Sequence, residues 1–492
     1  MTEQSASVQR HTAIIIGSGF GGQAAAVNLR RLGIDDLLML ERRAWPGGTW
    51  SQNCYPGAAV DVHSPLYSLS FEPYQWSQMF AGQQELVEYT NHVLTKHQLH
   101  EKIRLNANVT EVVWDAGESC WRIQTEGQGT FQAQFLINAS GPLSTPVIPA
   151  FKGRDSFKGR SFHTNAWDNG YDLKDKRVAV IGSGASAAQV IPAIAGEVKT
   201  LAVFQRTPHW VMPRSDRVFS TFERTLLGIK WFYTLLRIAI YWSLEWRVIG
   251  FKYSTALLNI IGGRAAVKHI ENQITDPALR AAVTPNYIIG CKRVILSNTL
   301  YPALARPNVR LHTQDDGIAE INERGIRTLK GEQLDLDLIV YSTGYDATDG
   351  AISYPVKGVG GVSIRDQWRE YPRAYLGTCL PGFPNFFVVT GPNTGIGHTS
   401  ALFIIESQME YIRRAIAAVQ SAKARSIEVT AEAENDYTTM IHREMQKTVW
   451  QTGGCHSWYQ SKSGHVIAMF PGFSFSFRLM AKAFKPSHHI IH

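Results

Sequence analysis

Apolar runs that end in glycine divide this chain into repeating units. The run at residues 13–16 leads into a GxGxxG pattern, and the run at residues 177–181 leads into a second pattern of the same kind. Consecutive β-favouring residues are typical of a buried parallel strand, and the glycines that follow predict a tight turn and the start of a helix. We therefore expect an α/β fold with two Rossmann-like domains. The small residues of the two turns are Gly17, Gly19 and Gly22, and Gly182, Gly184 and Ala187.

Further apolar runs predict how the chain is divided between these domains. Runs at 135–141, 336–344 and 385–390 predict additional strands, and we expect the last two to rejoin the first domain. The proline-rich stretch at 142–149 is typical of a crossing between domains. The predicted division is 1–150 and 331–492 for a discontinuous first domain and 151–330 for the second.

A stretch of helical periodicity interrupts the second domain. From residue 219 to residue 265, polar positions such as Lys230, Thr234 and Arg237 recur at helical spacing among apolar residues. No apolar run there approaches the ~20 residues that a membrane span needs. We expect an inserted helical subdomain at about 215–290. Three roles stay open for it: packing against the second domain, a lid over an apolar substrate site, or peripheral contact with a membrane.

Oppositely charged residues occupy equivalent positions in the two units. Glu41 and Arg206 each lie 24 residues after the first glycine of their turn. A carboxylate accepts a hydrogen bond from a ribose 2′-hydroxyl and repels a 2′-phosphate, whereas an arginine next to Thr207 pairs with that phosphate. The first unit is therefore predicted to bind FAD and the second NADPH.

Composition narrows the function classes and the compartment. Apolar residues make up 44% of the 492 residues and charged residues 18%, which is typical of a globular protein. The net charge of +8 comes from scattered basic residues, so we expect anionic cofactors and no nucleic acid. Residues 1–10 are polar, and no apolar stretch typical of a signal peptide comes before the first predicted strand. We therefore expect a cytoplasmic protein.

The cysteines predict neither a metal site nor a redox-active pair. Five cysteines are widely separated and include no CxxC. We expect them to be inert thiols of a reducing compartment. They are Cys54, Cys120, Cys291, Cys379 and Cys455.

The loop at residues 46–64 is rich in proline, glycine and aromatic residues. Loops at the carboxyl ends of strands in a doubly wound sheet bind ligands, so we expect this loop to cover the first cofactor. The cofactor-binding residues expected in and next to it are Thr49, Trp50, Asp61 and Tyr67.

Two further motifs combine glycine with aromatic and acidic residues. The first is formed by Phe157, Gly159, His163, Trp167 and Asp168, and the second by Gly48, Trp50, Tyr55, Pro56, Gly57 and Asp61. They resemble the fingerprints of the Baeyer–Villiger monooxygenases, flavin enzymes that insert oxygen next to a ketone. The related flavin-containing monooxygenases carry Tyr or Phe where this chain has Trp167. Segments at 205–214, 291–293, 342–346 and 391–400 also resemble the family, but the helical insert does not.

The resemblance implies two catalytic residues. Oxygen insertion in this family proceeds through a C4a-peroxyflavin, an anion that needs a fixed cation in a water-poor pocket. By resemblance, the cation is Arg293 and the carboxylate that orients it is Asp61. The family often has paired tyrosines downstream, where this chain has Leu300 and Tyr301.

The resemblance also implies further contacts with the cofactors. Lys292 would help Arg206 and Thr207 to hold the 2′-phosphate. Trp458 would contact the nicotinamide nucleotide or serve as a core aromatic. His163 would position a cofactor and link the domains, or act as a structural histidine. Ser186 and Asn393 complete the expected cofactor-binding set.

The predicted function is that of an FAD-dependent monooxygenase that converts small hydrophobic ketones to esters or lactones with NADPH and O2. The alternative is an N- or S-oxygenating flavin-containing monooxygenase that acts through a C4a-hydroperoxyflavin. A third class is a flavin-binding structural or sensor protein without turnover. Trp167 and Arg293 favour the first prediction over the second.

Overall fold

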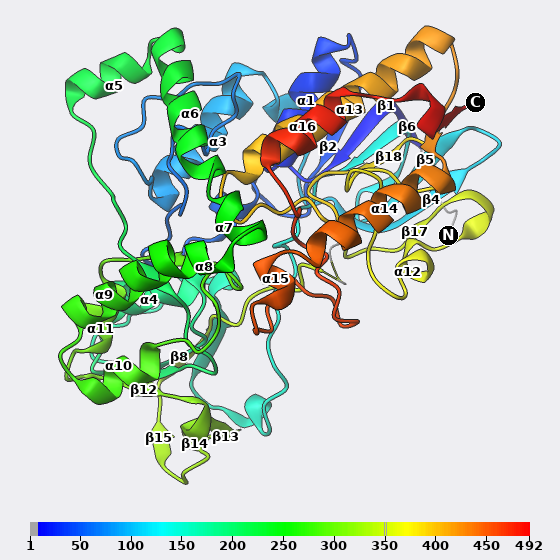
Figure 1. The fold of residues 1–492 in the computed structure, drawn as a ribbon. Helices are drawn as coiled ribbons and strands as arrows, with labels where there is room; N and C mark the ends of the chain where they lie inside the picture. Colours follow the sequence, from blue (N-terminus) through cyan, green and yellow to red (C-terminus); the bar gives the residue numbers. More distant parts are fainter. Residues whose placement is uncertain (1–7, 349, 351) are drawn as a thin grey trace, which may run out of the picture.

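Two separate sheets form the cores of the molecule (Figure 1); the first is mixed, with antiparallel pairs β4–β5 and β5–β6, and the second is parallel. The computed structural model describes residues 8–348, 350 and 352–492. Residues 1–7 of the polar N-terminal stretch therefore lie outside the described part. No helix in the described part is long and apolar enough to cross a bilayer.

The first sheet contains the strand that ends in the first glycine turn. Strand β1 pairs in parallel with β2 on one side and with β6 on the other, in the order β17–β4–β5–β6–β1–β2–β3, and β18 pairs with the end of β6. The strands are β1 (Gln9–Ile16), β2 (Leu37–Leu40), β3 (Ile103–Arg104), β4 (Asn108–Asp115), β5 (Cys120–Glu126), β6 (Gly129–Asn138), β17 (Val356–Lys357) and β18 (Phe386–Val388).

Helices far apart in sequence cover one face of this sheet (Figure 1). Ala13 and Ile15 point into a core shared with these helices, whereas Ile14 and Ile16 point to the opposite face, as strand alternation requires. The covering helices are α1 (Phe20–Arg31), α3 (Gln83–Lys96), α13 (Ala401–Ala422) and α16 (Ser474–Lys482). Nearby elements are α2 (Thr49–Gln52), α12 (Ile364–Gln367), α14 (Ala431–Met445), α15 (Val449–Thr452), β19 (Ile427–Val429) and β20 (His489–Ile491).

The second sheet is entirely parallel, in the order β12–β9–β8–β16–β7. Helices α4 and α11 pack on one face, and a small antiparallel sheet, β13–β14–β15, packs on the other. The elements are β7 (Arg160–His163), β8 (Arg177–Ile181), α4 (Ala185–Ile194), β9 (Thr200–Phe204), α11 (Leu300–Leu304), β12 (Val309–His312), β13 (Ile318–Asn322), β14 (Gly325–Thr328), β15 (Gln333–Asp335) and β16 (Leu338–Tyr341). Strands β10 (Val211–Met212) and β11 (Ile295–Leu296) pair beside it.

One strand lies in a different sheet from the one predicted. The run at 336–344 was expected to rejoin the first domain, but β16 lies between β8 and β7 in the second sheet. Only the later run, β18, returns to the first sheet. Both runs are fully buried parallel strands, so their local sequence does not distinguish the two sheets. The chain therefore returns after Tyr341, later than the predicted boundary at residue 331.

The insert in the second domain, which follows β10 and precedes β11 in the chain, is helical. It comprises α5 (Thr221–Leu227), α6 (Lys230–Glu245), α7 (Val248–Lys252), α8 (Thr255–Leu258), a π-helical turn (Asn259–Gly263), α9 (Arg264–Gln273) and α10 (Pro277–Val283). Tyr233 and Tyr241 of α6 belong to the core of the first sheet, whereas Ile270 of α9 belongs to the core of the second. The expectation that the insert packs against the second domain alone is therefore wrong for α6.

Candidate active site and cofactor turns

The first glycine turn has the geometry of a phosphate-binding cradle. Gly17 has φ +103°, and a Cβ there would lie 2.5 Å from the carbonyl oxygen of Ala139. A Cβ on Gly22 would lie 2.0 Å from the carbonyl oxygen of Gly17, so helix α1 and the turn pack closely only because this residue is glycine. Gly19 stands directly before the N-terminus of α1, where backbone N–H groups attract an anion.

Glu41 lies beside this turn at the end of β2. Its side chain is buried, and its Oε2 accepts hydrogen bonds from the backbone N–H of Ser18 at 3.2 Å and from the Ser18 hydroxyl at 2.7 Å. The carboxylate is thereby fixed next to the glycines, with acceptor capacity to spare. The arrangement fits the ribose of an adenine dinucleotide, as in FAD.

The aromatic loop at 46–64 lies against both cofactor turns. A Cβ on Gly48 would lie 2.8 Å from the Cα of Gly19, so this loop passes directly over the first turn. On its other side, the Tyr55 hydroxyl donates to Gln189 Oε1 of helix α4 at 2.9 Å. The loop therefore connects the two dinucleotide units, and its helix α2 carries Thr49 at the surface and Trp50 partly buried.

The second glycine turn repeats the first. Gly182 has φ +130°, and a Cβ there would lie 2.3 Å from the carbonyl oxygen of Ser342. A Cβ on Gly184, at the start of α4, would meet no heavy atom within 4 Å. Open space beside this backbone leaves room for a pyrophosphate to approach. Ser186 follows in the first turn of the same helix.

Basic side chains gather near this second turn. Arg206 is exposed at the end of β9, with Thr207 beside it. Burial and the nearby positive charge of Arg206 lower the pKa of Lys292. Two like charges held together are stabilised when an anion binds between them, so the pair fits a 2′-phosphate.

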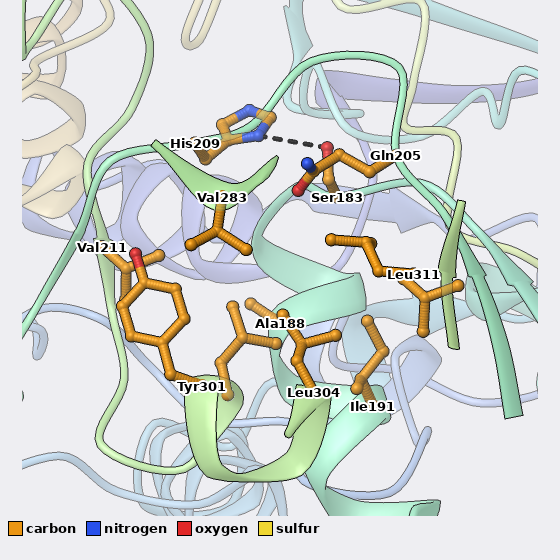
Figure 2. Close-up of a pocket in the computed structure, with 12 residues that line it drawn as sticks. Ser183, Ala188, Ile191, Gln205, His209, Val211, Val283, Tyr301, Leu304 and Leu311 are labelled. Atoms are coloured by element: carbon orange, nitrogen blue, oxygen red, sulfur yellow. Dashed lines mark hydrogen bonds between the residues drawn. The ribbon is translucent and has the colours of Figure 1, made fainter. Parts of the chain in front are cut away.

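A small cavity lies beneath the same turn (Figure 2). The figure shows Ser183, Gln205 and His209 above a lining of apolar side chains from α4 and α11. Its volume of about 20 Å³ holds about one water molecule, so it is too small for a nucleotide. Tyr301, at the position where the resemblance predicted a second tyrosine, points into this cavity within the core of the second domain.

Arg293 and Asp61 form a bidentate ion pair. Arg293 Nε donates to Asp61 Oδ2 at 2.6 Å, and Arg293 Nη2 donates to Asp61 Oδ1 at 2.5 Å. Burial tends to raise the pKa of Asp61, but the positive charge of Arg293 and its hydrogen bonds lower that pKa overall. The negative charge of Asp61 raises the pKa of Arg293 well above its usual value. Both side chains keep about a third of their surface exposed, so a ligand can reach the pair.

Two tyrosines stand beside the ion pair. The Tyr67 hydroxyl accepts a hydrogen bond from Trp50 Nε1 at 3.2 Å. Burial raises the pKa of Tyr67 and of Tyr459 to about 12, so both hydroxyls stay protonated at neutral pH. Tyr459 was missed in the sequence. The only signal for it is its place next to Trp458, whose indole packs 4.6 Å from the Tyr459 ring and is 46% exposed.

A disulfide bond joins Cys291 to Cys455, so the expectation of five unpaired thiols is wrong. The two residues are 164 positions apart, which is why no short cysteine motif signalled the bond. Cys291 immediately precedes Lys292 and Arg293, so the bond attaches the arginine segment to the C-terminal part of the chain. The free cysteines are Cys54, Cys120 and Cys379.

The first fingerprint motif lies where the two domains meet. His163 is buried at the end of β7, and its Nδ1 accepts a hydrogen bond from the Asn165 backbone at 3.0 Å. Burial lowers the pKa of His163 to about 4, so the ring is neutral at pH 7. These features favour a structural role over acid–base chemistry.

Neighbouring residues of this motif form the contacts between the domains. The Asn165 amide donates to the Tyr345 hydroxyl at 3.2 Å, and that hydroxyl donates to Asn53 of the aromatic loop at 2.9 Å. Trp167 packs edge-on against Phe162, and Asp168 pairs with Arg160 at 2.9 Å. Gly159 is required because a Cβ there would lie 2.7 Å from the backbone carbonyl oxygen of Asp337, as well as 2.4 Å from the Phe157 ring.

Asn393 has a role in positioning a loop. Its side-chain amide donates to the carbonyl oxygens of Val466 and Met469, each at 3.0 Å. The residue has φ +55°, which asparagine tolerates better than most residues. Its amide group is therefore used to attach the 391–400 loop to the C-terminal segment.

Comparison with known protein families gives partial and full-length matches. A model of the pyridine nucleotide-disulphide oxidoreductase family matches residues 14–221. A Baeyer–Villiger monooxygenase of Pseudomonas aeruginosa is 40% identical over 490 residues, which is 99% of this chain and 92% of that protein. A Baeyer–Villiger monooxygenase of Streptomyces coelicolor is 41% identical over 475 residues, 96% of this chain and 91% of that protein.

Solved structures resemble the whole chain. A structure of OTEMO in complex with FAD and NADP has a TM-score of 0.89 at 27% identity and covers 98% of this chain and 99% of that one. A closed structure of cyclohexanone monooxygenase has a TM-score of 0.88 at 27% identity and covers 99% and 100%. A steroid monooxygenase bound to NADP has a TM-score of 0.88 at 29% identity and covers 98% and 99%.

Proposed function

This chain belongs to the Baeyer–Villiger monooxygenase family, and from that premise we propose that it converts apolar ketones to esters or lactones with FAD, NADPH and O2. The observation that carries the proposal is the Arg293–Asp61 ion pair, whose carboxylate belongs to the loop that connects the two dinucleotide units. A pair of this kind supplies a permanent, oriented positive charge to an otherwise aromatic site.

The two cofactors have distinct sets of binding residues. Gly17, Gly19 and Glu41 would hold the adenine half of FAD, with the aromatic loop over it. Arg206 and Lys292 would hold the 2′-phosphate of NADPH. Held by these residues, FAD would supply the redox chemistry, with NADPH as hydride donor and O2 as the source of the inserted oxygen. The remaining proposed cofactor contacts are Gly22, Thr49, Trp50, Asp61, Tyr67, Gly182, Gly184, Ser186, Thr207, Asn393 and Trp458.

Arg293 acts on the substrate through its charge. Attack on a ketone carbonyl places negative charge on the carbonyl oxygen, and a guanidinium fixed in advance stabilises that charge without reorganising. Asp61 holds the guanidinium by two hydrogen bonds and keeps it protonated. Because the pKa of Asp61 is lowered, the carboxylate stays ionised at neutral pH and the pair is preserved.

The proposal extends to the class of substrate and to the place of the enzyme in the cell. We propose a small hydrophobic ketone, because Tyr67 and Tyr459 stand beside the ion pair and pack against Trp50 and Trp458, respectively. We further propose that the helical insert contacts a membrane surface peripherally, since large apolar side chains are exposed on it. The assignment to the cytoplasm stays a prediction from the N-terminal sequence.

Product identification tests the proposed function. The holoenzyme, supplied with NADPH and air, is incubated with linear, cyclic, aryl and steroidal ketones, and products are identified by mass spectrometry. We expect esters or lactones from at least one class. Hydrogen peroxide alone from every ketone, together with oxygenation of amines or thioethers, would show that the alternative N- or S-oxygenase chemistry is correct.

A further inference from the structure

Helix α6 exposes a continuous apolar stripe to solvent. Its members are four, three, four and four residues apart, which places them on one face of the helix. Trp231 is 65% exposed, Leu235 56% and Trp242 54%, although such side chains are ordinarily buried in a soluble protein. We call these residues the α6 stripe: Trp231, Leu235, Ile238 and Trp242 of the helix, and Trp246 at its C-terminal cap.

The opposite face of α6 attaches the helix to the protein. The Tyr233 hydroxyl accepts from Trp76 Nε1 at 3.0 Å and shares a hydrogen bond with Ser68 at 2.8 Å, and Ile240 and Leu244 are buried in the same core. The stripe therefore faces away from the core, and it does not cover a substrate site as a lid would. Figure 1 shows α5 and α6 at the outer edge of the molecule.

The exposed charges of residues 219–265, the segment that carries the stripe, are almost all positive. From residue 219 to residue 265 the chain has two acidic residues. Glu245 is fully buried, and Glu223 forms a capping box with Ser220 and pairs with Arg217. Within residues 219–265 the exposed basic residues are Arg224, Lys230, Arg247 and Arg264; beyond this range, α9 exposes both Lys268 and Glu271.

We propose that the α6 stripe seats the enzyme on an anionic lipid bilayer. Tryptophans are enriched where a membrane meets water, and basic side chains beside them pair with anionic headgroups. A helix with one apolar face and a basic rim lies in the plane of that interface. A second copy of this chain fits less well, because a twofold contact would bring two basic patches together.

The inner end of α6 is hydrogen-bonded to the C-terminal part of the chain and lies next to the 391–400 loop. Glu245 accepts from the Ser474 backbone at 2.5 Å and from the Ser474 hydroxyl at 2.7 Å, and its Oε2 lies 3.1 Å from His398 Nε2. His398 belongs to the 391–400 loop, which Asn393 attaches to residues 466–469. An enzyme seated on a bilayer would be close to a reservoir of apolar ketones, a consequence that rests on the proposed function.

Vesicle flotation tests the bilayer contact. The purified full chain is mixed with vesicles of phosphatidylcholine alone or of phosphatidylcholine with phosphatidylserine. We expect flotation with the anionic vesicles, weaker flotation with neutral vesicles and release by salt. The double variant Leu235→Ser with Ile238→Ser should bind at least about tenfold more weakly, because interfacial binding follows buried apolar area.

A matched control uses equally exposed apolar residues far from α6. Leu329 is 60% exposed and Val359 43%, and the variant Leu329→Ser with Val359→Ser should float like wild type. Both double variants should keep wild-type turnover of a water-soluble ketone, which shows that they fold. Equal flotation of the two variants, no flotation of wild type, or a dimer that only the α6 variant dissociates would overturn the proposal. Flotation is measured without substrate, so its failure leaves the proposed reaction standing.

Discussion

Arg293 and Asp61 are 232 positions apart in sequence, yet two hydrogen bonds join them. Each residue raises the fraction of the other that is charged, so the pair is an electrostatic unit and neither member acts alone. The disulfide of Cys291 lies two residues before the arginine and limits how far its segment can move. The chemistry of the site therefore depends on contacts from three distant segments of the chain.

Arg206 is expected to determine the choice of nicotinamide cofactor. The variant Arg206→Gln loses a charge-assisted hydrogen bond to the 2′-phosphate, so KM for NADPH should rise about tenfold to a hundredfold. KM for NADH should change little, because NADH lacks that phosphate. Steady-state kinetics with both cofactors measures the difference.

A second arginine provides the control for this comparison. Arg310 lies on the neighbouring strand β12 and pairs with Glu332 at the surface. Arg310→Gln should leave both KM values as in wild type. Equal increases for NADPH and NADH in Arg206→Gln would contradict the assignment of this residue to the 2′-phosphate.

His163 makes the stability of the protein depend on pH. Its pKa is about 4 in the folded protein and 6.5 in the reference state, so the unfolded chain binds a proton first as the pH falls. The stabilisation is complete above pH 6.5 and is lost as the pH falls towards 4. At pH 5 the loss amounts to about 2 kcal/mol for this one group.

Denaturant unfolding at pH 7 and pH 5 measures this effect. His163→Asn keeps an acceptor for the Asn165 N–H but removes the titrating ring. The variant should lose less free energy of unfolding between the two pH values than wild type does. An identical loss would show that His163 is not the group responsible.

The two glycines of the second turn, between β8 and α4, are expected to have different roles: Gly182 in stability and Gly184 in NADPH binding. Gly182→Ala should lower the free energy of unfolding by more than about 1 kcal/mol, because φ +130° strains alanine and its Cβ meets backbone. Gly184→Ala has room for a Cβ and φ −77°, so it should fold normally. It should nevertheless weaken NADPH binding, because the methyl group occupies the space of the pyrophosphate.

Thermal unfolding and NADPH titration of the two variants distinguish these effects. A Gly184→Ala protein that binds NADPH like wild type would show that the pyrophosphate does not lie at this turn. A Gly182→Ala protein as stable as wild type would contradict the strained turn geometry.

Local sequence predicted the helices, strands and turns better than it predicted which of them contact one another. Both glycine turns and the helices of the insert lie where periodicity and glycine spacing predict them. The sheet of β16 was predicted wrongly, because a buried parallel strand has the same apolar pattern in either sheet. The Cys291–Cys455 bond and the place of Tyr459 depend on contacts between distant segments, for which one sequence contains no local signal.

At the scale of the whole molecule, one loop connects the two cofactor units. The Gln189 side chain of α4 accepts from the Tyr55 hydroxyl and donates to the Ala59 carbonyl at 2.9 Å. A Cβ on Gly57 would lie 2.6 Å from the Gln189 carbonyl oxygen, so the loop and α4 are in close contact. The two cofactor turns thus lie on either side of a single segment, which also contains Asp61.

The proposed contact of α6 with a bilayer also concerns the whole molecule. The insert packs on both cores, through Tyr233 on the first and Ile270 on the second. A surface attached to both domains can orient the whole enzyme towards an apolar substrate reservoir. A bilayer contact accounts for the three tryptophans of the α6 stripe that stay exposed although the interior of the protein is well packed.

The central claim is that Arg293 is required for oxygen insertion and not for flavin reduction. The most direct measurement is a single turnover in which the holoenzyme is reduced anaerobically by NADPH, then mixed with O2 and a ketone, and the ester is quantified. Arg293→Ala should be reduced by NADPH at close to the wild-type rate but form at least about a hundredfold less ester, with hydrogen peroxide in its place. The exposed Arg369→Ala should behave like wild type in both phases. Ester formation by Arg293→Ala at the wild-type yield would contradict the account.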